Sequence, residues 1–496
     1  MFAKQTLSLL AIAVSTNFFC LPTAAVWAQQ EGDRVVVTAN YETKFRKEIV
    51  GRVFEGDIRT LKELNGTWCR VDRVEGWLPT QNVMSLESGL EHFSTRIENN
   101  EKDEIALAHR GMIFHELEEF DRALNDLNNS LGVNQKNPVT WMLRGMVLKA
   151  QNKNELASAD LKHAIKLNPK LANAHFNLGL VYYANDNYEE ALKYYNQAIK
   201  RNDDVALWFV SRGSTHLALD DSVAAASDYK KSLELDPNLA DAWVGLSNIS
   251  LVKEDFEAAL EAANKAVELQ PKNAMALNAR GWVQYKRDDL EEALYDLNRA
   301  IRFAPRLSIA YGNRGVCHVS KNNFDQAIAD HSRHLKLAPN SPFALSNRAV
   351  AWLGKGEFKK AKEDYEAAEK LSPDLDESLN GYAWFLATCP DEAFRDGKEA
   401  VKRAEKACEI SAGKDWYHLD TLAAAHAENG DFNKAVEFAQ KAIDVAPDNK
   451  RKLCEQQLAR FKEKKPFRSQ VGKNAEASIR DNVAAENQNQ AENQNQ

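Results

Sequence analysis

The chain has 496 residues, of which 44% are hydrophobic, and it carries a formal net charge of -8 at pH 7. The acidic balance argues against a general nucleic-acid-binding protein, which needs a basic face. The hydrophobic content suffices for packed helices. Five cysteines follow residue 28, and their odd number and irregular spacing indicate neither a disulfide framework nor a zinc site. They are Cys69, Cys317, Cys389, Cys408 and Cys454.

The first 28 residues have the pattern of an export signal. Lys4 supplies a positive start, residues 7–14 form an apolar core, and Val26-Trp27-Ala28 is a cleavage site of the usual small-residue type. We therefore expect a signal peptide over 1–28 and a mature protein in the periplasm, at the cell envelope or secreted. A lipid anchor on Cys20 and an uncleaved N-terminal anchor are the alternatives. No later stretch has the length of a transmembrane span.

Residues 31–85 are predicted to form a small β-domain. Short β-branched or aromatic runs alternate there with glycine, asparagine and charged residues, which is typical of strands and turns. Trp68, followed by Gly76-Trp77-Leu78-Pro79, resembles the end of an SH3 or bacterial SH3-like barrel. The resemblance implies a ligand groove of Tyr41, Trp68, Trp77 and Pro79. Alternatively, Trp68 belongs to the core and Trp77 is half-buried.

A period of 34 residues governs the chain from residue 104 onward. Small residues recur at this spacing, as Gly111, Gly145, Gly179, Gly213, Ser247, Gly281, Gly315 and Ala349. An alanine stands twelve residues after each, from Ala123 to Ala361, and most repeats close on a proline such as Pro169 or Pro237. The small residue and the alanine let two helices approach closely, and the proline stops the second helix.

This pattern resembles the tetratricopeptide repeat (TPR) family over roughly three quarters of the chain. The family's pattern of Trp, Leu-Gly, Tyr, Ala and Pro is carried here by Trp141, Gly145, Ala157, Pro169, Leu178, Gly179, Tyr182 and Ala191. The resemblance implies a mainly α fold, a right-handed TPR α-solenoid superhelix preceded by the small SH3-like β-barrel. Each repeat is expected to hold a helix A, a short turn and a helix B.

Ten repeats are predicted over residues 104–448. They start at residues 104, 138, 172, 206, 240, 274, 308, 342, 376 and 416. Repeat nine has an enlarged turn at 389–397, so that its alanine, Ala400, comes five residues late. A half-repeat helix and connector over 86–103 should join the β-domain to the array. An amphipathic helix over 449–465 should cap its end, and an Asn/Gln-rich tail over 466–496 should be disordered.

Arginine and aspartate occur together in six repeats, at positions 7 and 23. The pairs are Arg110 and Asp126, Arg144 and Asp160, Arg212 and Asp228, Arg280 and Asp296, Arg314 and Asp330, and Arg348 and Asp364. The other four repeats lack both partners. This co-occurrence predicts a salt bridge between helix A and helix B of one repeat, since a lone buried guanidinium would be costly. The alternative is that the arginines face the groove and bind an acidic ligand.

In the TPR family, positions 2, 5, 9 and 12 of helix A line the concave groove, which gives a set of apolar and aromatic residues here. They are Met112, Met142, Met146, Phe176, Leu180, Tyr183, Met275, Trp282, Tyr285, Ile309, Val316, Val319, Phe343 and Val350. The resemblance implies a ligand with an apolar extended or helical segment, and methionines adapt to different partners. Alternatively, several of these side chains pack between adjacent A helices.

Repeat seven carries three unusual histidines. His331 and His334 lie three residues apart on the predicted helix B, and His318 should face them from helix A. Such a cluster could hold zinc or respond to protons. The alternative is structural, because His216 and His426 occupy the position of His318 in other repeats.

No catalytic residues are predicted, since the chain has no phosphate-binding loop, nucleophile elbow or paired cysteines. No cofactor is expected. The leading hypothesis is therefore an exported scaffold that binds proteins or peptides, and possible partners include components of the cell envelope. The second hypothesis is a metal- or pH-responsive regulator that works through repeat seven, and an enzyme with an unrecognised site is the third.

Overall fold

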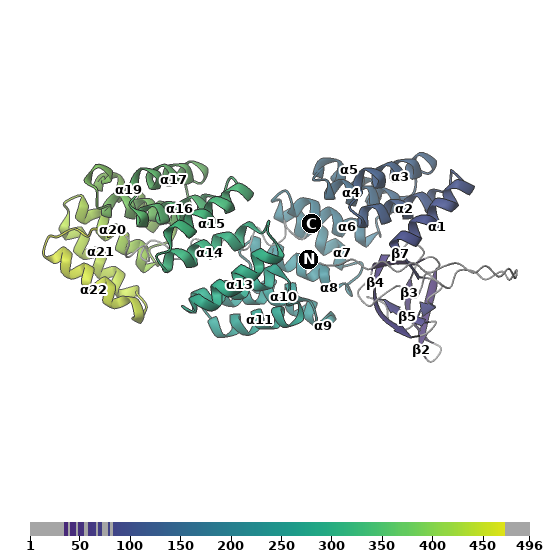
Figure 1. Ribbon diagram of the computed structural model, residues 1–496, viewed down its shortest axis with the longest axis horizontal. Coiled ribbons are helices and arrows are strands. Elements are labelled where there is room, and N and C mark those ends of the chain that lie inside the picture. Colours follow the sequence, from purple (N-terminus) through teal and green to yellow (C-terminus); the bar gives the residue numbers. More distant parts are fainter. Residues whose placement is uncertain are drawn as a thin grey trace, which may run out of the picture. The chain divides into compact units, whose positions relative to one another are not determined.

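The computed structural model describes residues 34–37, 40–45, 48–53, 58–65, 68–71, 78–79 and 83–471. It is mainly helical, and Figure 1 shows helices following one another in pairs along most of the chain. The chain divides into two compact units, residues 1–181 and residues 182–496, and each is described by itself below. The predicted signal peptide and residues 472–496 of the predicted tail lie outside the described residues.

The β-domain contains two antiparallel sheets in its described part. The strands are β1 (Arg34–Val37), β2 (Tyr41–Phe45), β3 (Glu48–Val53), β4 (Ile58–Asn65), β5 (Trp68–Val71), β6 (Leu78–Pro79) and β7 (Val83–Ser85). Five strands form a sheet in the order β6-β5-β4-β1-β7, and β2 pairs with β3. The short runs that indicate strands in the sequence are residues 35–37, 49–54, 58–64, 67–71 and 76–78, and β2 and β7 fall outside them. The SH3-like barrel itself stays a prediction, since the described strands form two separate sheets.

The first sheet and the first helix share a core. α1 (Leu86–Asn99) follows β7 directly, and the Ser85 hydroxyl caps it by accepting a hydrogen bond from the Ser88 N–H. Phe93 of α1, Val36 of β1 and Ile113 of the next helix are all fully buried in one cluster. This packing joins the β-domain to the helices that follow.

Ten helix pairs then follow at the predicted spacing. The A helices are α2 (Glu104–Glu116), α4 (Pro138–Ala150), α6 (Ala172–Tyr183), α8 (Ala206–Ala218), α10 (Ala240–Val252), α12 (Ala274–Lys286), α14 (Ser308–Ser320), α16 (Pro342–Lys355), α18 (Asp376–Thr388) and α20 (Trp416–Glu428). The B helices are α3 (Phe120–Val133), α5 (Asn154–Leu167), α7 (Tyr188–Ile199), α9 (Ser222–Leu235), α11 (Phe256–Leu269), α13 (Leu290–Phe303), α15 (Phe324–Leu337), α17 (Phe358–Leu371), α19 (Gly397–Ile410) and α21 (Phe432–Val445). Every A helix begins at the residue where the sequence pattern starts a repeat.

The turn between helix A and helix B is the same in the first seven repeats. One residue in each turn has a positive φ, between 55° and 69°, at Glu118, Asn152, Asp186, Asp220, Glu254, Asp288 and Asn322. Asparagine and aspartate tolerate this left-handed conformation better than most residues. Gly356 takes the place in repeat eight with a φ of 83°. A residue in this conformation ends helix A and reverses the chain into helix B.

Close contact between the helices of a pair depends on the small residue of helix A. A Cβ atom on Gly145 would lie 2.8 Å from Cγ of Leu161, and one on Gly281 would lie 2.9 Å from Cγ of Leu297. The period therefore places glycine opposite a large side chain of helix B, and the alanine twelve residues later is fully buried in every regular repeat, from Ala123 to Ala361.

The C-terminal end departs from this regularity. Between α18 and α19 the chain makes the enlarged turn, with a short 3-10 helix η3 (Glu392–Phe394), and α22 (Asp448–Lys462) follows the tenth pair. The prediction of a disordered tail from residue 466 is wrong for residues 466–471, because Phe467 packs against Trp384 and Ser469 bonds to Thr388. Within the described ranges, no helix has both the length and the apolar character needed to cross a membrane.

Candidate functional site

All six Arg–Asp pairs form within their repeats. In each pair the arginine Nε and Nη2 donate to the two carboxylate oxygens at 2.6–2.9 Å. The carboxylates are buried, whereas about a fifth of each arginine side chain remains exposed. The hydrogen bond to Asp330 raises the pKa of Arg314, and Asp126 raises the pKa of Arg110 in the same way. A bidentate pair of this kind fixes helix A against helix B.

The same arginines also bond to the preceding helix B, which the sequence reasoning missed. Nη1 of each arginine donates to a side-chain oxygen sixteen residues earlier, at 2.7–3.2 Å. These acceptors are Ser94, Asn128, Asn196, Asn264, Asn298 and Ser332. Each arginine therefore joins three helices, and it is the residue that ties one repeat to the next.

A sequence signal for this contact exists at position 25. Position 25 is Asn or Ser in each full repeat that is followed by a repeat with the arginine at position 7. Where position 7 of the next repeat is Leu178, Leu246 or Tyr382, position 25 is instead Lys162, Lys230 or Glu366, respectively. In the last case Tyr382 Oη donates to a carboxylate oxygen of Glu366 at 3.3 Å. Because the arginines already have two sets of acceptors, the structure favours their structural role over the binding of an acidic ligand.

Stacked rings join helix A to helix B in two of the four repeats that lack the ion pair. Tyr182 stacks on Tyr194 with ring centroids 5.4 Å apart in repeat three, and His426 stacks on Phe438 at 5.5 Å in repeat ten. The helix B partner stands at position 23, as the aspartate does, whereas the helix A partner stands at position 11 and not at position 7. An aromatic contact in these two repeats therefore holds the helix pair that an ion pair holds elsewhere.

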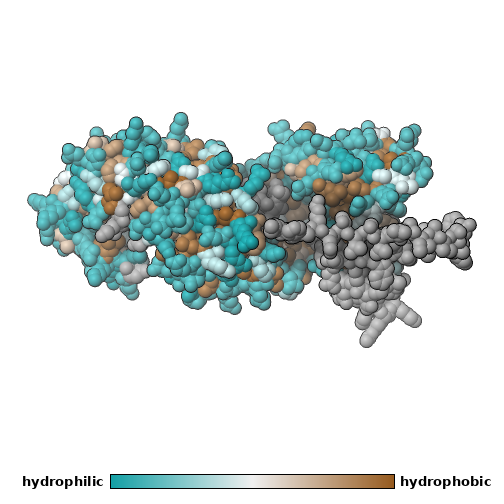
Figure 2. Space-filling view, in the orientation of Figure 1, coloured by the Kyte–Doolittle hydropathy of each residue, from teal (hydrophilic) through white to brown (hydrophobic). Residues whose placement is uncertain are grey.

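Positions 2, 5, 9 and 12 of the A helices are called here the helix-A stripe, and the fourteen predicted groove residues at these positions divide into two classes. Nine are less than a tenth exposed, namely Met142, Phe176, Tyr183, Met275, Trp282, Ile309, Val316, Val319 and Val350. Five are partly exposed, namely Met112, Met146, Leu180, Tyr285 and Phe343. On the face shown in Figure 2, apolar residues reach the surface as small patches among hydrophilic ones. Only the second class is available to a partner without rearrangement.

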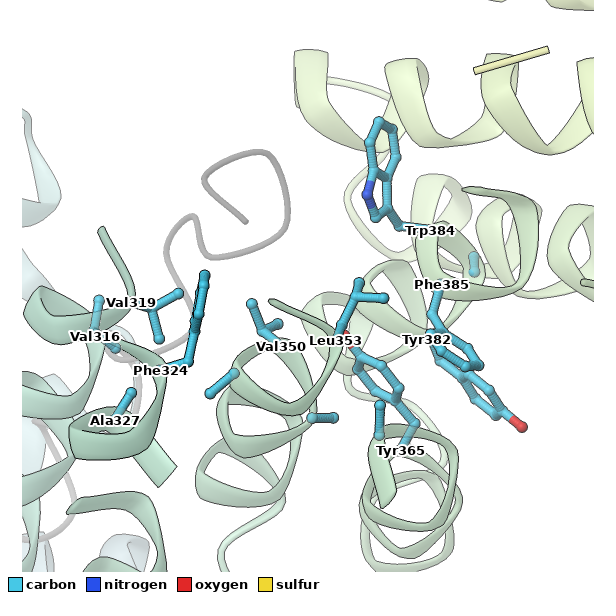
Figure 3. Packing of buried hydrophobic residues seen from close by; sticks show 14 of the residues in the cluster. Val316, Val319, Phe324, Ala327, Val350, Leu353, Tyr365, Tyr382, Trp384 and Phe385 are labelled. Atoms are coloured by element: carbon cyan, nitrogen blue, oxygen red, sulfur yellow. The ribbon is translucent and has the colours of Figure 1, made fainter. Parts of the chain in front are cut away.

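Six of the nine buried residues belong to one core cluster that runs from α10 to α22, namely Met275, Trp282, Ile309, Val316, Val319 and Val350. Figure 3 shows Val316 and Val319 on α14, Val350 and Leu353 on α16, and a group of aromatic residues around α18. Packing between successive A helices accounts for these side chains. In repeat six, buried Trp282 stacks on Tyr285 with ring centroids 4.8 Å apart. The partly exposed Tyr285 ring is therefore held in place by a buried side chain.

The three histidines of repeat seven do not form a metal site. Among the described residues, no three His, Cys, Asp or Glu side chains are grouped so that they could hold a metal ion. His331 and His334 are buried in the pair interface instead, where a Cβ on Gly315 or Gly312 would come within 2.7 Å of a ring nitrogen. His318 of α14 is less buried, and its Nε2 lies 3.9 Å from an oxygen of Asp330 on α15.

Burial also keeps His331 neutral near physiological pH. It lowers the pKa of His331 to about 3, with smaller contributions from His334, Arg348 and His318. The ring is therefore neutral throughout the physiological range. His331 fills the place taken by leucine or tyrosine in the other regular repeats except repeat five, which has Ala263 there. Glycine at residue 312 leaves room for His334.

The predicted SH3-like groove is described only in part. Tyr41 starts β2, where it pairs with Val53, and Trp68 of β5 pairs with Pro79 of β6. Trp77 lies outside the described residues. Trp68 and Pro79 thus lie on adjacent strands, and the binding role of this group stays a prediction.

The C-terminal segment contains contacts that the sequence did not indicate. The Phe467 ring lies 5.4 Å from that of Trp384, a residue at position 9 of repeat nine and hence in the helix-A stripe. Arg468 forms an ion pair with Glu428 at the end of α20. A segment after the last helix therefore occupies one part of the stripe.

Several family models match the repeats. One described as TPR repeat matches residues 145–186, and models described as tetratricopeptide repeat match residues 172–204, 210–274, 244–308 and 419–449. No curated protein sequence matches the chain significantly.

Solved structures that the chain is similar to include YrrB, described as a TPR protein with an unusual peptide-binding site. The two chains are 24% identical, the match covers 38% of this chain and 98% of that chain, and the TM-score is 0.32. A tetratricopeptide repeat protein from Parabacteroides merdae is 16% identical over 53% of this chain and 99% of that chain, with a TM-score of 0.43. Yeast Tom70 is 15% identical over 76% and 92%, with a TM-score of 0.38. The matched segments show that the chain contains tetratricopeptide repeats.

Proposed function

We propose that the protein is a non-enzymatic scaffold that binds partner proteins or peptides through the helix-A stripe. The observation that carries this proposal is the partly exposed ring of Tyr285, which stacks on buried Trp282 of the core. Fixed aromatic side chains bind partners well, because little conformational entropy is lost when they are covered. The partner segments would be apolar and extended or helical.

The experiment uses the full chain with Tyr285→Ala and Phe343→Ala, two partly exposed stripe residues. Trp282 is left unchanged because its removal would open a cavity in the core. We expect cross-linking to envelope proteins to fall at least about tenfold relative to the native chain. The matched control is Tyr295→Ala, since Tyr295 is 64% exposed on a B helix. Equal loss in the control, or no loss in the stripe variant, would contradict the proposal.

The proposal extends to location and to the β-domain. The N-terminal pattern supports export to the periplasm, the cell envelope or the medium, and the SH3-like resemblance supports a second binding site near Trp68 and Pro79. N-terminal sequencing of the protein isolated from the envelope fraction tests the first point, with a start at residue 29 expected. The same cross-linking experiment, carried out with a chain that lacks residues 34–85, tests the second binding site.

A further inference from the structure

The last described segment of the chain, residues 465–471, folds back on the A helices of repeats nine and ten, and it is called here the C-terminal strap. It follows α22 after a turn in which Lys464 has a positive φ of 57°. The strap contains neither helix nor a regular strand, and it contacts α18, α20 and α22. Its last residue, Val471, also lies beside Gly356 at the end of α16. It is thus an extended segment bound to a surface of helices.

The aromatic anchor of the strap is Phe467. Its ring lies 5.4 Å from the Trp384 ring on one side, and the Arg460 guanidinium of α22 stands 5.8 Å from its centroid. Trp384 leaves α18 on the side opposite to Tyr382, away from the contact with helix B (Figure 3). The indole therefore contacts the Phe467 ring in addition to its place in the buried core.

Main-chain recognition occurs at the end of α18. The Ser469 N–H donates to the Thr388 carbonyl oxygen at 2.9 Å, and the two hydroxyl oxygens are 2.8 Å apart. The last carbonyl groups of a helix have no partner within the helix. The strap satisfies one of them, and both residues are buried. Main-chain bonding of this kind gives affinity to an extended peptide of almost any sequence.

Charge recognition is provided by Glu428. One of its carboxylate oxygens lies 2.6 Å from Nη2 of Arg468, and the other accepts a hydrogen bond from Nε of Arg395 at 2.9 Å. Arg395 belongs to the enlarged turn, where its Nη1 donates to the carbonyl oxygens of Cys389 and Pro390. The additional residues of repeat nine thus position the carboxylate that binds the strap.

We propose that this surface, formed by Trp384, Thr388 and Glu428, is a binding site for an extended partner segment that carries an aromatic residue followed by arginine and a hydroxyl residue. The strap occupies the site in cis until such a partner displaces it. The inference rests on the proposed function, because Trp384 belongs to the helix-A stripe, and it names the chemistry of one class of partner. Release of the strap breaks no helix, since the strap lies beyond α22.

Tethering determines how strongly the strap competes. A short tether holds a segment at an effective concentration in the millimolar range, so a free peptide of the same sequence competes poorly with it. A partner that also contacts another part of the stripe gains the same advantage. The strap therefore selects for partners with more than one contact.

The experiment is a titration of a labelled peptide with the sequence of residues 464–471 against two full-length proteins. The first is the native chain, and the second carries Phe467→Ala and Arg468→Ala, which release the strap. We expect the released variant to bind the peptide at least about tenfold more tightly than the native chain. Peptides in which the phenylalanine is alanine, or the arginine is glutamate, should not bind. The strap variant Gln470→Ala, at an exposed residue, should behave as the native chain does.

Two outcomes would overturn the inference. The first is that the released variant does not bind the peptide at about 1 mM, although its circular dichroism shows the same helix content as the native chain. If the variant does not fold, hydrogen exchange of the Ser469 amide in the native chain decides instead, because exchange only through global unfolding would make the strap a fixed part of the fold. Cross-linking that depends on Tyr285 is measured separately, so failure here leaves the proposed function standing.

Discussion

The regular repeats and the C-terminal end are built from the same helix pairs but are held together by different chemistry. In the regular repeats an Arg–Asp pair recurs at fixed positions, and the arginine reaches back to the preceding repeat. In repeat nine Arg403 takes the aspartate position and bonds to Glu369 and Glu399, and repeat ten uses stacked His426 and Phe438.

The difference shows what each arrangement provides. Where the ion pair recurs, successive repeats make the same contact with each other. Little at the surface of these repeats then distinguishes one from another. The enlarged turn and the additional aromatic residues of the C-terminal end depart from the regular repeat, and among the described residues the C-terminal strap binds there. The period therefore provides the scaffold, and the departures from it provide specific recognition. Four measurements, taken from the largest expected effect to the smallest, test this distinction.

The first measurement removes the ion pair from a regular repeat. Arg144→Leu leaves the buried Asp160 carboxylate without its partner, and we expect the free energy of unfolding to fall by about 3 kcal/mol. The double variant Arg144→Leu/Asp160→Tyr copies Leu178 and Tyr194 of repeat three and should regain most of the loss. Urea unfolding of the three proteins measures both effects. A loss below about 0.5 kcal/mol in the single variant would show that the pair does not hold the repeat.

The second measurement concerns a buried acid of the C-terminal end. Burial, together with a hydrogen bond to Asp376, raises the pKa of Glu377 to about 8. The folded state thus binds this proton more tightly than the unfolded state, so the stabilisation is lost as pH rises from about 4.5 towards 8. Between about pH 6.5 and pH 8.5 we expect the free energy of unfolding to fall by about 2 kcal/mol.

Glu377→Gln should remove most of that pH dependence, because glutamine imitates the protonated acid. The window lies above the range in which His418 titrates, since burial lowers the pKa of that histidine. Glu392→Gln is the control, because the Glu392 side chain is 90% exposed. If the variant and the native chain respond equally to pH, Glu377 is ionised in the folded protein.

The third measurement concerns repeat seven, where the free energy of unfolding should depend on pH in the opposite direction. Since burial lowers the pKa of His331 to about 3, its contribution to stability is lost as pH falls below about 6.5. His331→Leu places at this position the residue found in repeats one, two and six. Between about pH 6.5 and pH 4.5 the free energy of unfolding should fall in both proteins, and we expect the fall to be roughly 1–2 kcal/mol smaller in the variant than in the native chain. Parallel curves for the two proteins would show that another group controls the acid response.

The fourth measurement tests the link between repeats. Asn128 accepts a hydrogen bond from Arg144 Nη1 at 2.8 Å, and Asn128→Ala removes only that contact. Because the contact is exposed, we expect a loss of about 0.5 kcal/mol in the free energy of unfolding. Asn129→Ala is the neighbouring control. A double-mutant cycle with Arg144→Leu should show coupling, and strictly additive losses would contradict a link through this bond.

Much of the repeated fold follows from the sequence. The period places the starts of the A helices, from Glu104 to Trp416, and the joint occurrence of Arg144 and Asp160 indicates their contact. Both signals are local, since the partners of a pair lie sixteen residues apart within one helical hairpin. The histidines of repeat seven were harder to interpret, because their burial against Gly312 and Gly315 depends on the exact fit of two helices.

The sequence by itself determined the period, the helix pairs and the partners within each repeat, because helix periodicity and short hairpins are encoded over a few tens of residues. Only the tertiary structure decided which stripe residues are covered, that Asn128 completes the contacts of Arg144, and that residues 465–471 bind to α18 and α20. The Thr388–Ser469 contact joins residues 81 positions apart, and no local pattern specifies a contact at that separation. Such contacts depend on how successive repeats pack, which is set by the fit of many side chains together.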